Sequence, residues 1–345
     1  MSLETAVERL ELPLEFPFTI ARGTQSHVEA VVVTVEADGH VGVGAAGPAA
    51  HYGETADTVE AVLPELLAVV EEVGDPAALG RIERRMREAV RRNPAARCAV
   101  SVALHDLQAK RLGVPLYRLW GLDPAETPPS SYTIGIDDLD RMREKTAVAL
   151  ERGHEVLKVK VGTDRDEEIV RTVREVAPDA TLYVDANEAW TPKEAVAKIE
   201  TLAAYDLEFV EQPVPAEDPA GLKHVHDRSP LPIAADESLI TASDVPAVAD
   251  RCDVANLKLM KCGGLREARR IVHAARAHGL EVMCGCMTES NASIAAACHL
   301  APMLDYADLD GALLLAEDVY DGVPMSGGRI DLAALDRPGT GAVRR

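Results

Sequence analysis

Two lysines one residue apart, Lys158 and Lys160, lie within the apolar stretch 156–161. Side chains of a β-strand repeat every two residues, so a strand here would place both ammonium groups on one face. Like charges repel, and we expect this repulsion to lower the pKa of at least one lysine and supply a free amine base near neutral pH. Lysines are scarce, nine against 27 arginines, and two more, Lys258 and Lys261, share a second short apolar stretch.

Three carboxylates, Asp185, Glu211 and Asp236, each end a strand-like stretch. Carboxylates on neighbouring strands would repel one another unless a cation joined them, and oxygen ligands suit a hard divalent ion. The set predicts a Mg²⁺ site with positions open for substrate oxygens. Each residue also has a plainer interpretation, since Asp236 could cap a helix and Glu211 could pair with an arginine. Three carboxylates in succession, with lysines on either side, favour the metal site.

The elements that would position these groups alternate between strand-like and helix-compatible stretches after residue 130. Eight strands, each but the last followed by a helix-compatible stretch, predict a (β/α)7β-like barrel, a modified TIM barrel, in preference to an open sheet. Strand ends of a barrel meet at one mouth, where active sites are built. The predicted strands are 132–136, 156–161, 182–185, 208–211, 233–236, 255–260, 282–286 and 306–310.

The chain before the barrel has a different pattern. Strands at 7–14, 18–22, 30–35 and 41–45, then helices at 56–73, 80–91 and 95–111, predict an α+β capping domain. Gly42, Gly44 and Gly47 spell a dinucleotide-binding fingerprint, but a loop with Pro48 follows where a helix should begin, so we predict a hairpin. We expect the capping domain over 1–125, the barrel over 126–320 and a C-terminal segment, 321–345, that returns to the capping domain.

Within such a barrel, Lys160 on the second strand and Lys258 on the sixth would approach the axis from nearly opposite sides. A carbon acid between them could lose a proton to one lysine and gain a proton from the other. The metal would bind the substrate carboxylate and stabilise an enolate-like intermediate. We expect Lys158 to tune Lys160 and contact the substrate carboxylate, and Lys261 to be solvated or to support the site.

Composition limits the partners and the compartment. A formal net charge of −21 argues against binding to nucleic acid or to an anionic membrane. No apolar run approaches the roughly 20 residues that span a bilayer, and residues 1–9 lack a secretory signal, so we expect a cytoplasmic protein. The six cysteines show no paired spacing and are expected to be reduced core residues. The acidic composition, with 3% aromatic residues, suggests adaptation to high salt.

The ordered strand-end motifs resemble those of the enolase superfamily, specifically its muconate-lactonising subgroup. The likeness covers nearly the whole chain, and it is far less specific for the substrate than for the superfamily. The motifs that carry it are Lys158-x-Lys160, Asp185-Ala-Asn187, Glu211-Gln-Pro213, Asp236-Glu-Ser238 and Lys258-Leu-Met-Lys261 followed by Gly263-Gly264.

Within that subgroup the last strand resembles the Asp-x-Asp motif of dipeptide epimerases. There, Asp308 and Asp310 would hold the free ammonium group of the substrate, and both would lie on one strand face. The resemblance also implies backbone contacts to the dipeptide from Cys286, Met287 and Thr288. Thr133 matches a pocket position. Arg22 lies in a loop similar to the one that closes over the substrate side chain in alanyl-glutamate epimerases; it could supply a cation there or be an ordinary rim arginine.

The resemblance implies a Mg²⁺-dependent isomerase that inverts the α-carbon of the C-terminal residue of an L,L-dipeptide. N-acylamino acid racemase, o-succinylbenzoate synthase and muconate cycloisomerase are the alternatives, since they share the lysines and the metal ligands but not a substrate with a free amine. A catalytically silent barrel would have lost a lysine or a carboxylate, and this chain has lost none. The resemblance also implies a homo-oligomer.

Overall fold

A computed structural model describes residues 3–345, so Met1 and Ser2 of the predicted capping domain lie outside the described residues. Eight parallel strands follow one another in chain order around a curled sheet, and a parallel bridge between Ser130 and Ala307 joins its two edges. This arrangement confirms the predicted (β/α)7β barrel with an N-terminal α+β capping domain. The strands are β4 (Tyr132–Ile134), β5 (Val156–Lys160), β6 (Thr181–Asp185), β7 (Leu207–Glu211), β8 (Ile233–Ala235), β9 (Val254–Lys258), β10 (Glu281–Gly285) and β11 (Tyr306–Ala307).

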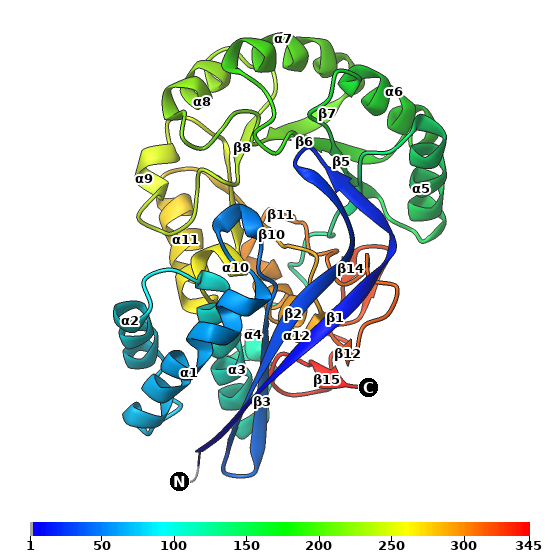
Figure 1. Ribbon diagram of the computed structural model, residues 1–345. Helices are drawn as coiled ribbons and strands as arrows, with labels where there is room; N and C mark the ends of the chain where they lie inside the picture. The colour runs from blue at the N-terminus through cyan, green and yellow to red at the C-terminus, as the bar shows by residue number, and fades with distance from the viewer. Residues whose placement is uncertain (1–2) are drawn as a thin grey trace.

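Helices between the strands form an arc around the outside of the barrel (Figure 1). Helices α5 and α7 begin at sequence-encoded caps, because the side chains of Asp138 and Thr191 accept from backbone N–H groups in the first turn. The helices are α5 (Leu139–Glu151), α6 (Asp166–Val176), α7 (Pro192–Leu202), α8 (Pro219–His226), α9 (Val245–Val248), α10 (Leu259–Cys262), α11 (Leu265–Ala277) and α12 (Asn291–Cys298).

The two-residue period of the strands divides the barrel interior into an apolar layer and a polar layer. On β6 Tyr183 is two residues before Asp185, and on β7 Phe209 is two residues before Glu211. The two aromatic rings stack at 4.3 Å and pack with inward residues of β8, β9 and β10 in one buried cluster. The carboxylates therefore lie one step nearer the C-terminal ends of the strands, above an apolar floor.

The capping domain is a three-stranded antiparallel sheet covered by helices. Its elements are β1 (Leu3–Ile20), β2 (Gly23–Ala37), β3 (His40–Ala46), α1 (Ala56–Val73), α2 (Leu79–Ala89) and α3 (Pro94–Arg111). A Cβ on Gly42 would lie 2.0 Å from the carbonyl oxygen of Ala103, and one on Gly44 would lie 2.2 Å from that of Ala99. These glycines allow β3 to pack closely against α3, as the hairpin interpretation requires.

Strands β1 and β2 are longer than predicted, 18 and 15 residues, and form a hairpin that extends from the capping domain to the barrel (Figure 1). Its pairing shifts register between Pro13 and Phe18, which explains the break that the sequence suggested. At the tip, the backbone N–H of Ile136 donates to the carbonyl oxygen of Thr19 at 2.9 Å. The tip is thus fixed beside the end of β4.

The C-terminal residues pack on the capping domain and also on the barrel, where the backbone N–H of Ser130 donates to the carbonyl oxygen of Gly328 at 2.7 Å. Short strands β12 (Tyr320–Asp321) and β15 (Val343–Arg344) pair with each other, and so do β13 (Met325–Ser326) and β14 (Arg329–Ile330). The backbone N–H of Thr340 donates to Asp106 of α3 at 2.7 Å, and Arg344 pairs with Glu8 of β1. The domain limits at residues 125 and 320 stay a prediction.

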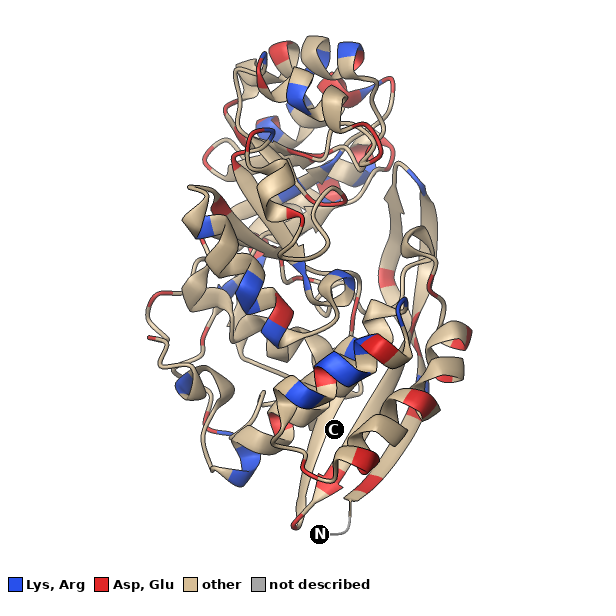
Figure 2. Ribbon diagram, turned by 90° about the vertical axis from the view of Figure 1, so that its left-hand side faces the viewer, with Lys and Arg blue, Asp and Glu red and all other residues tan. Residues whose placement is uncertain are grey.

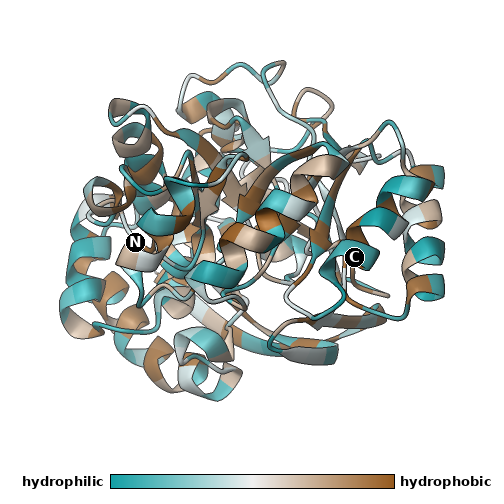
Figure 3. Ribbon diagram, turned by 90° about the horizontal axis from the view of Figure 1, so that it is seen from above, coloured by the Kyte–Doolittle hydropathy of each residue, from teal (hydrophilic) through white to brown (hydrophobic). Residues whose placement is uncertain are grey.

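Most charged side chains lie on the outer helices, and the barrel interior is apolar except for the polar groups at the C-terminal ends of the strands. Acidic and basic side chains are spread over the exposed helices (Figure 2), whereas the barrel strands are largely apolar (Figure 3). All six cysteines are unpaired, five of them buried and Cys286 half-buried. Within residues 3–345, no helix combines the length and the apolar character needed to cross a bilayer.

Candidate active site

The three predicted metal ligands lie together at the C-terminal ends of adjacent strands. Asp185 and Glu211 are register partners on β6 and β7, and Asp236 follows β8. All three side chains are completely buried. Because parallel strands are about 4.8 Å apart, this register places the carboxylates side by side, as predicted.

Neighbouring polar groups hold these carboxylates in position. Asn256 Nδ2 donates to Glu211 Oε1 at 2.7 Å. The backbone N–H of Asp236 donates to Gln212 Oε1 at 2.9 Å, which fixes the loop after β8. Lys261 Nζ lies 2.5 Å from both the carbonyl oxygen and Oδ1 of Asp236. Lys261 is fully buried, so the expectation that it is solvated is wrong and its supporting role is the one the structure favours.

The donor set fits a divalent cation. Glu211 Oε2 and Asp236 Oδ2 are buried and accept no hydrogen bond among residues 3–345, although each lies near a lysine. Burial, followed by the adjacent charge of Asp185, raises the pKa of Glu211 to about 8. Ionising a carboxylate buried in this way is costly, and a bound Mg²⁺ would stabilise the ionised form. Carboxylate oxygens are also the ligands that Mg²⁺ prefers.

The two predicted catalytic lysines flank the carboxylates on strands four apart in the barrel. Lys160 Nζ on β5 lies 2.7 Å from Asp185 Oδ2, and Lys258 Nζ on β9 lies 2.7 Å from Asp236 Oδ2. Both side chains are nearly buried, with 7% and 6% exposed. Burial opposes ionisation of Lys258, but the charge of Asp236 outweighs it and raises the pKa of Lys258. Strands β5 and β9 face each other across an eight-stranded barrel, so the lysines approach from opposite sides.

The environment of Lys158 corrects the expected effect of the lysine pair. Its Nζ lies 2.8 Å from both Asp308 Oδ2 and Glu211 Oε2 and 3.1 Å from Asp185 Oδ2. Burial disfavours the ammonium form, but these carboxylates outweigh burial and raise the pKa of Lys158 well above its usual value. The three carboxylates, and not repulsion by Lys160, therefore determine the pKa of Lys158. The sequence alone did not show that three carboxylates surround this amine.

Asp308 and Asp310 are both buried, but they do not lie on a strand as predicted. Strand β11 ends at Ala307, and both aspartates lie in the segment after it. Asp308 accepts from Ser131 Oγ at 2.7 Å, and Asp310 Oδ2 accepts from the backbone N–H of Thr133 at 2.6 Å. Burial and the charge of Asp308 raise the pKa of Asp310 to about 7. Asp308 thus already has a cation in Lys158, whereas Asp310 forms no ion pair among residues 3–345.

Arg22, at the tip of the β1–β2 hairpin, is engaged by two barrel carboxylates. Its guanidinium donates to Glu188 Oε2 at 3.0 Å and to Glu237 Oε1 at 2.7 Å. His51 Nε2 lies 3.1 Å from Glu188 Oε2. His51, Glu188 and Glu237 thus form a second group that could bind a cation, and the guanidinium of Arg22 occupies that position. Thr133 is buried beside Asp310, while Cys286, Met287 and Thr288 follow β10 and are half-buried. Substrate contacts of all these residues stay a prediction.

No role was predicted from the sequence for Asn256, Gln212 or Glu237, although Gln212 and Glu237 lie within the strand-end motifs. Asn256 is two residues before Lys258 on β9, so the period of the strand could have placed it on the same inward face. Gln212 has φ of 35°, and its amide bridges two strand ends, which no sequence pattern indicates.

Comparison with known proteins agrees with this geometry. Residues 141–343 match the enolase C-terminal domain-like family, and residues 2–121 match the N-terminal domain of mandelate racemase and muconate lactonizing enzyme. The chain is 39% identical to the L-Ala-D/L-Glu epimerase of Bacteroides thetaiotaomicron, over 97% of this chain and 86% of that protein.

Two solved structures of dipeptide epimerases have the same fold. One, from Enterococcus faecalis V583, is complexed with Mg and L-Leu-L-Tyr; its TM-score is 0.90 at 34% identity, over 100% of both chains. The other, from Methylococcus capsulatus, is complexed with Mg and L-Arg-D-Lys; its TM-score is 0.90 at 36% identity, over 99% of this chain and 100% of that chain. The chain therefore belongs to the enolase superfamily, with the N- and C-terminal domains of the mandelate racemase and muconate lactonizing enzyme family.

Proposed function

We propose that this protein is a Mg²⁺-dependent dipeptide epimerase that inverts the α-carbon of the C-terminal residue by two-base proton transfer. The observation that carries the proposal is the pair Lys160 and Lys258 on opposite sides of a buried carboxylate set, each within 2.7 Å of one carboxylate. The relatives described above are named epimerases, and two hold Mg and a dipeptide, which confirms the predicted reaction class and cofactor.

The two lysines carry out the proton transfer. The one that faces the α-hydrogen, as a free amine, takes that proton, and the electron pair of the C–H bond moves into the carboxylate of the substrate as an enolate. The opposite lysine, as an ammonium, then donates a proton to the other face of the α-carbon. When bound by Asp185, Glu211 and Asp236, Mg²⁺ stabilises the negative charge that develops on the substrate carboxylate.

The remaining charged groups position the substrate. Lys158 lies among three carboxylates and reduces the repulsion between them, which keeps the polar groups around the substrate in place. Asp310 is buried without a cationic partner among the described ion pairs, so it is the group that we assign to the ammonium of the dipeptide, with Asp308 beside it. Because that ammonium is absent from N-acyl and cyclic substrates, this assignment favours a dipeptide over the substrates of the three alternative enzymes.

A single experiment tests the reaction and separates the alternatives. Incubation with Mg²⁺ and a panel of L,L-dipeptides in D₂O should exchange the C-terminal α-proton and produce the L,D-epimer, both visible by ¹H NMR. Exchange without an epimer in every dipeptide would contradict the proposal. The double variant Asp308→Ala, Asp310→Ala should lose turnover of dipeptides, and faster turnover of an N-acylamino acid than of any dipeptide would favour the racemase alternative.

The second side chain of the substrate is not determined by the family. The relatives are named for, or hold, Ala-Glu, Leu-Tyr and Arg-Lys dipeptides, which differ in charge and size. In this chain Arg22 is bound to Glu188 and Glu237, so an acidic side chain would have to displace at least one of these carboxylates. A charge-reversed panel, from Ala-Glu to Ala-Lys, measures that preference directly.

Three further expectations stay predictions: a cytoplasmic location, a homo-oligomer and adaptation to high salt. The acidic coat implied by a net charge of −21 carries the last of these, since mutual repulsion weakens as salt rises. Unfolding at low salt would support it, and full stability there would contradict it. Sedimentation of the purified protein would give its oligomeric state.

A further inference from the structure

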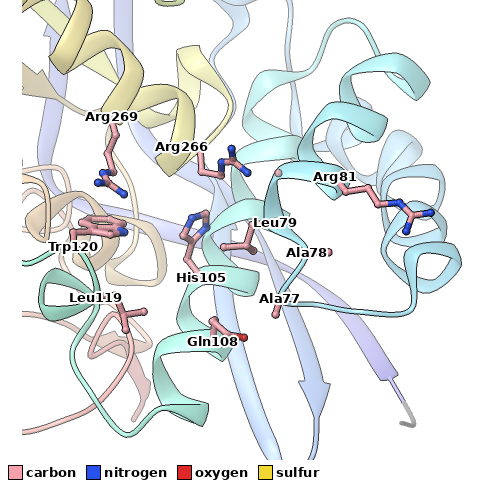
Figure 4. A pocket seen from close by; sticks show the side chains of 11 residues that line it. Ala77, Ala78, Leu79, Arg81, His105, Gln108, Leu119, Trp120, Arg266 and Arg269 are labelled. Carbon is pink, nitrogen blue, oxygen red and sulfur yellow. The ribbon is translucent and has the colours of Figure 1, made fainter.

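A cavity of about 500 Å³ lies away from the barrel mouth, where the capping helices α2 and α3 meet α11 of the barrel (Figure 4). None of the proposed metal ligands or lysines lines it. Pockets that take small molecules are about 300–1,000 Å³, so the space is large enough for a ligand. Its lining residues are Ala77, Ala78, Leu79, Gly80, Arg81, His105, Gln108, Leu119, Trp120, Arg266 and Arg269.

The cavity has two arginines that are poorly neutralised. Arg269 lies over the Trp120 ring, 5.0 Å from its centroid, and its buried Nε–H donates to no acceptor among residues 3–345. Arg266 is paired only weakly, with its Nε 3.5 Å from Glu83 Oε2. Figure 4 shows both guanidinium groups on the side of His105 that faces α11, whereas the Arg81 side chain extends away from them. Two such arginines side by side form a local site for a carboxylate.

The opposite wall offers hydrogen-bond acceptors. Gln108 Oε1 is buried and accepts nothing among the described residues. His105 Nδ1 faces the carbonyl oxygen of Ser101 at 2.7 Å, so it carries the proton and leaves Nε2 as an acceptor. Burial lowers the pKa of His105 to about 4, which keeps the ring neutral. Acceptors of this kind call for an N–H group on the ligand.

The rest of the wall is apolar. Leu79, Leu119 and the alanines at 77 and 78 line it beside the indole of Trp120. Each unpaired buried polar atom costs about 1–3 kcal/mol, so a ligand that pairs the donor and the acceptors while covering the apolar wall would bind favourably.

We propose that this cavity binds a small carboxylate that carries an amide N–H and an apolar side chain, as an N-acylamino acid or the C-terminal end of a short peptide does. The carboxylate contacts Arg269 and Arg266, the N–H donates to Gln108 or His105, and the side chain covers Leu79 and Leu119. The site is separate from the barrel mouth and does not depend on the proposed epimerase reaction.

Calorimetric titration with N-acetyl-L-leucine tests the proposal. The wild-type protein should bind it, and Arg269→Ala should weaken binding at least about 10-fold, because a charge-assisted hydrogen bond is lost. Arg81→Ala is the matched control, since it removes a lining arginine whose side chain points away, and its affinity should stay within about 2-fold of the wild type. 4-Methylpentanoate, which lacks the N–H, should bind at least about 10-fold more weakly than N-acetyl-L-leucine.

Several results would overturn the site. Absence of binding at millimolar N-acetyl-L-leucine, or equal affinity in the wild type and Arg269→Ala, would mean that the cavity holds only water. Equal affinity for 4-methylpentanoate would exclude recognition of the amide. If Arg269→Ala does not fold, Leu119→Trp fills the apolar end and should abolish binding. An inactive epimerase that still binds N-acetyl-L-leucine would contradict the proposed function and leave this inference intact.

Discussion

The barrel mouth and the contact between cap and barrel bury polar groups in opposite ways. In the mouth, Lys158 and Lys261 are fully buried in ion pairs: Lys158 Nζ lies within 3.1 Å of three carboxylates, and Lys261 Nζ lies 2.5 Å from Asp236 Oδ1. At the cap contact, His105 and His299 are also buried, but burial lowers the pKa of each to about 4 and leaves them neutral. His299 accepts from the backbone N–H of Tyr117 at 3.1 Å and faces the carbonyl of Thr340.

This difference predicts which change destabilises each region. The stability of a buried charged network depends on every member, because removing one member leaves the others as unpaired charges in the protein interior. A neutral polar contact needs only that its groups stay neutral, so it depends on pH. We therefore expect mutation and metal to act at the mouth, and acid to act at the cap contact.

The largest effect on epimerisation should come from Lys160 and Lys258, the two proposed catalytic lysines. Lys160→Ala and Lys258→Ala should each lower epimerisation by roughly 10³-fold, in the range for loss of a general acid or base. One variant should still exchange the α-proton of the L,L-substrate and the other that of the L,D-substrate, because one base remains on each face. ¹H NMR of exchange in D₂O with both epimers measures this. Retained exchange of the same epimer in both variants would contradict opposite placement.

The next largest effect is on the free energy of unfolding and concerns Lys158. Lys158→Met should lower the free energy of unfolding by about 3–5 kcal/mol, since Asp185, Glu211 and Asp308 lose their common cation. Lys223→Met is the matched control, because Lys223 forms an exposed pair with Asp227 that should contribute less than about 1 kcal/mol. Urea unfolding without metal gives both values, and similar losses would remove the distinction between the regions.

Mg²⁺ should stabilise the mouth and leave the cap contact unchanged. At 100 times its Kd, a ligand that binds only the folded state adds about 2.7 kcal/mol, and EDTA should reverse the effect and abolish turnover. Thermal melting at constant ionic strength measures the shift, and constant ionic strength matters for so acidic a chain. Asp236→Asn should remove most of the shift. An equal shift in that variant would place the ion elsewhere.

Acid should act at the cap contact. The folded pKa of His105 lies below the ordinary value of about 6.5, so the unfolded chain binds more protons between pH 6.5 and 4 and stability falls as pH is lowered through that range. At pH 5 the cost is about 2 kcal/mol for this histidine and similar for His299. His105→Gln should flatten the dependence of unfolding free energy on pH relative to the wild type. Parallel curves would contradict this assignment.

Much of the site could be predicted from sequence because strand ends determine it. Lys160, Asp185, Glu211, Asp236 and Lys258 each sit at or just after a strand end, and the barrel order makes those ends neighbours. Barrel order does not predict which individual side chains touch. The sequence therefore did not predict the raised pKa of Lys158 or the burial of Lys261. The ion pairs of Arg22 join residues 166 and 215 positions apart, and no local pattern encodes such a contact. The cavity at the cap contact has the same origin, since α2, α3 and α11 create it jointly.

The bridge between Ser130 and Ala307 has a consequence for the motion of the barrel. Strand β11 contains two residues, so the backbone pairing that closes the ring is short, with Ser131 N–H donating to Ala307 at 2.9 Å. Asp308, next to it, is tied across the same gap to Ser131 and Lys158. Amide hydrogen exchange should therefore be faster here than in the longer neighbouring strands, because local opening needs few bonds to break. Asp308 thus takes part in ring closure in addition to the substrate contact proposed for it above, and its substitution would loosen the scaffold as well as the pocket.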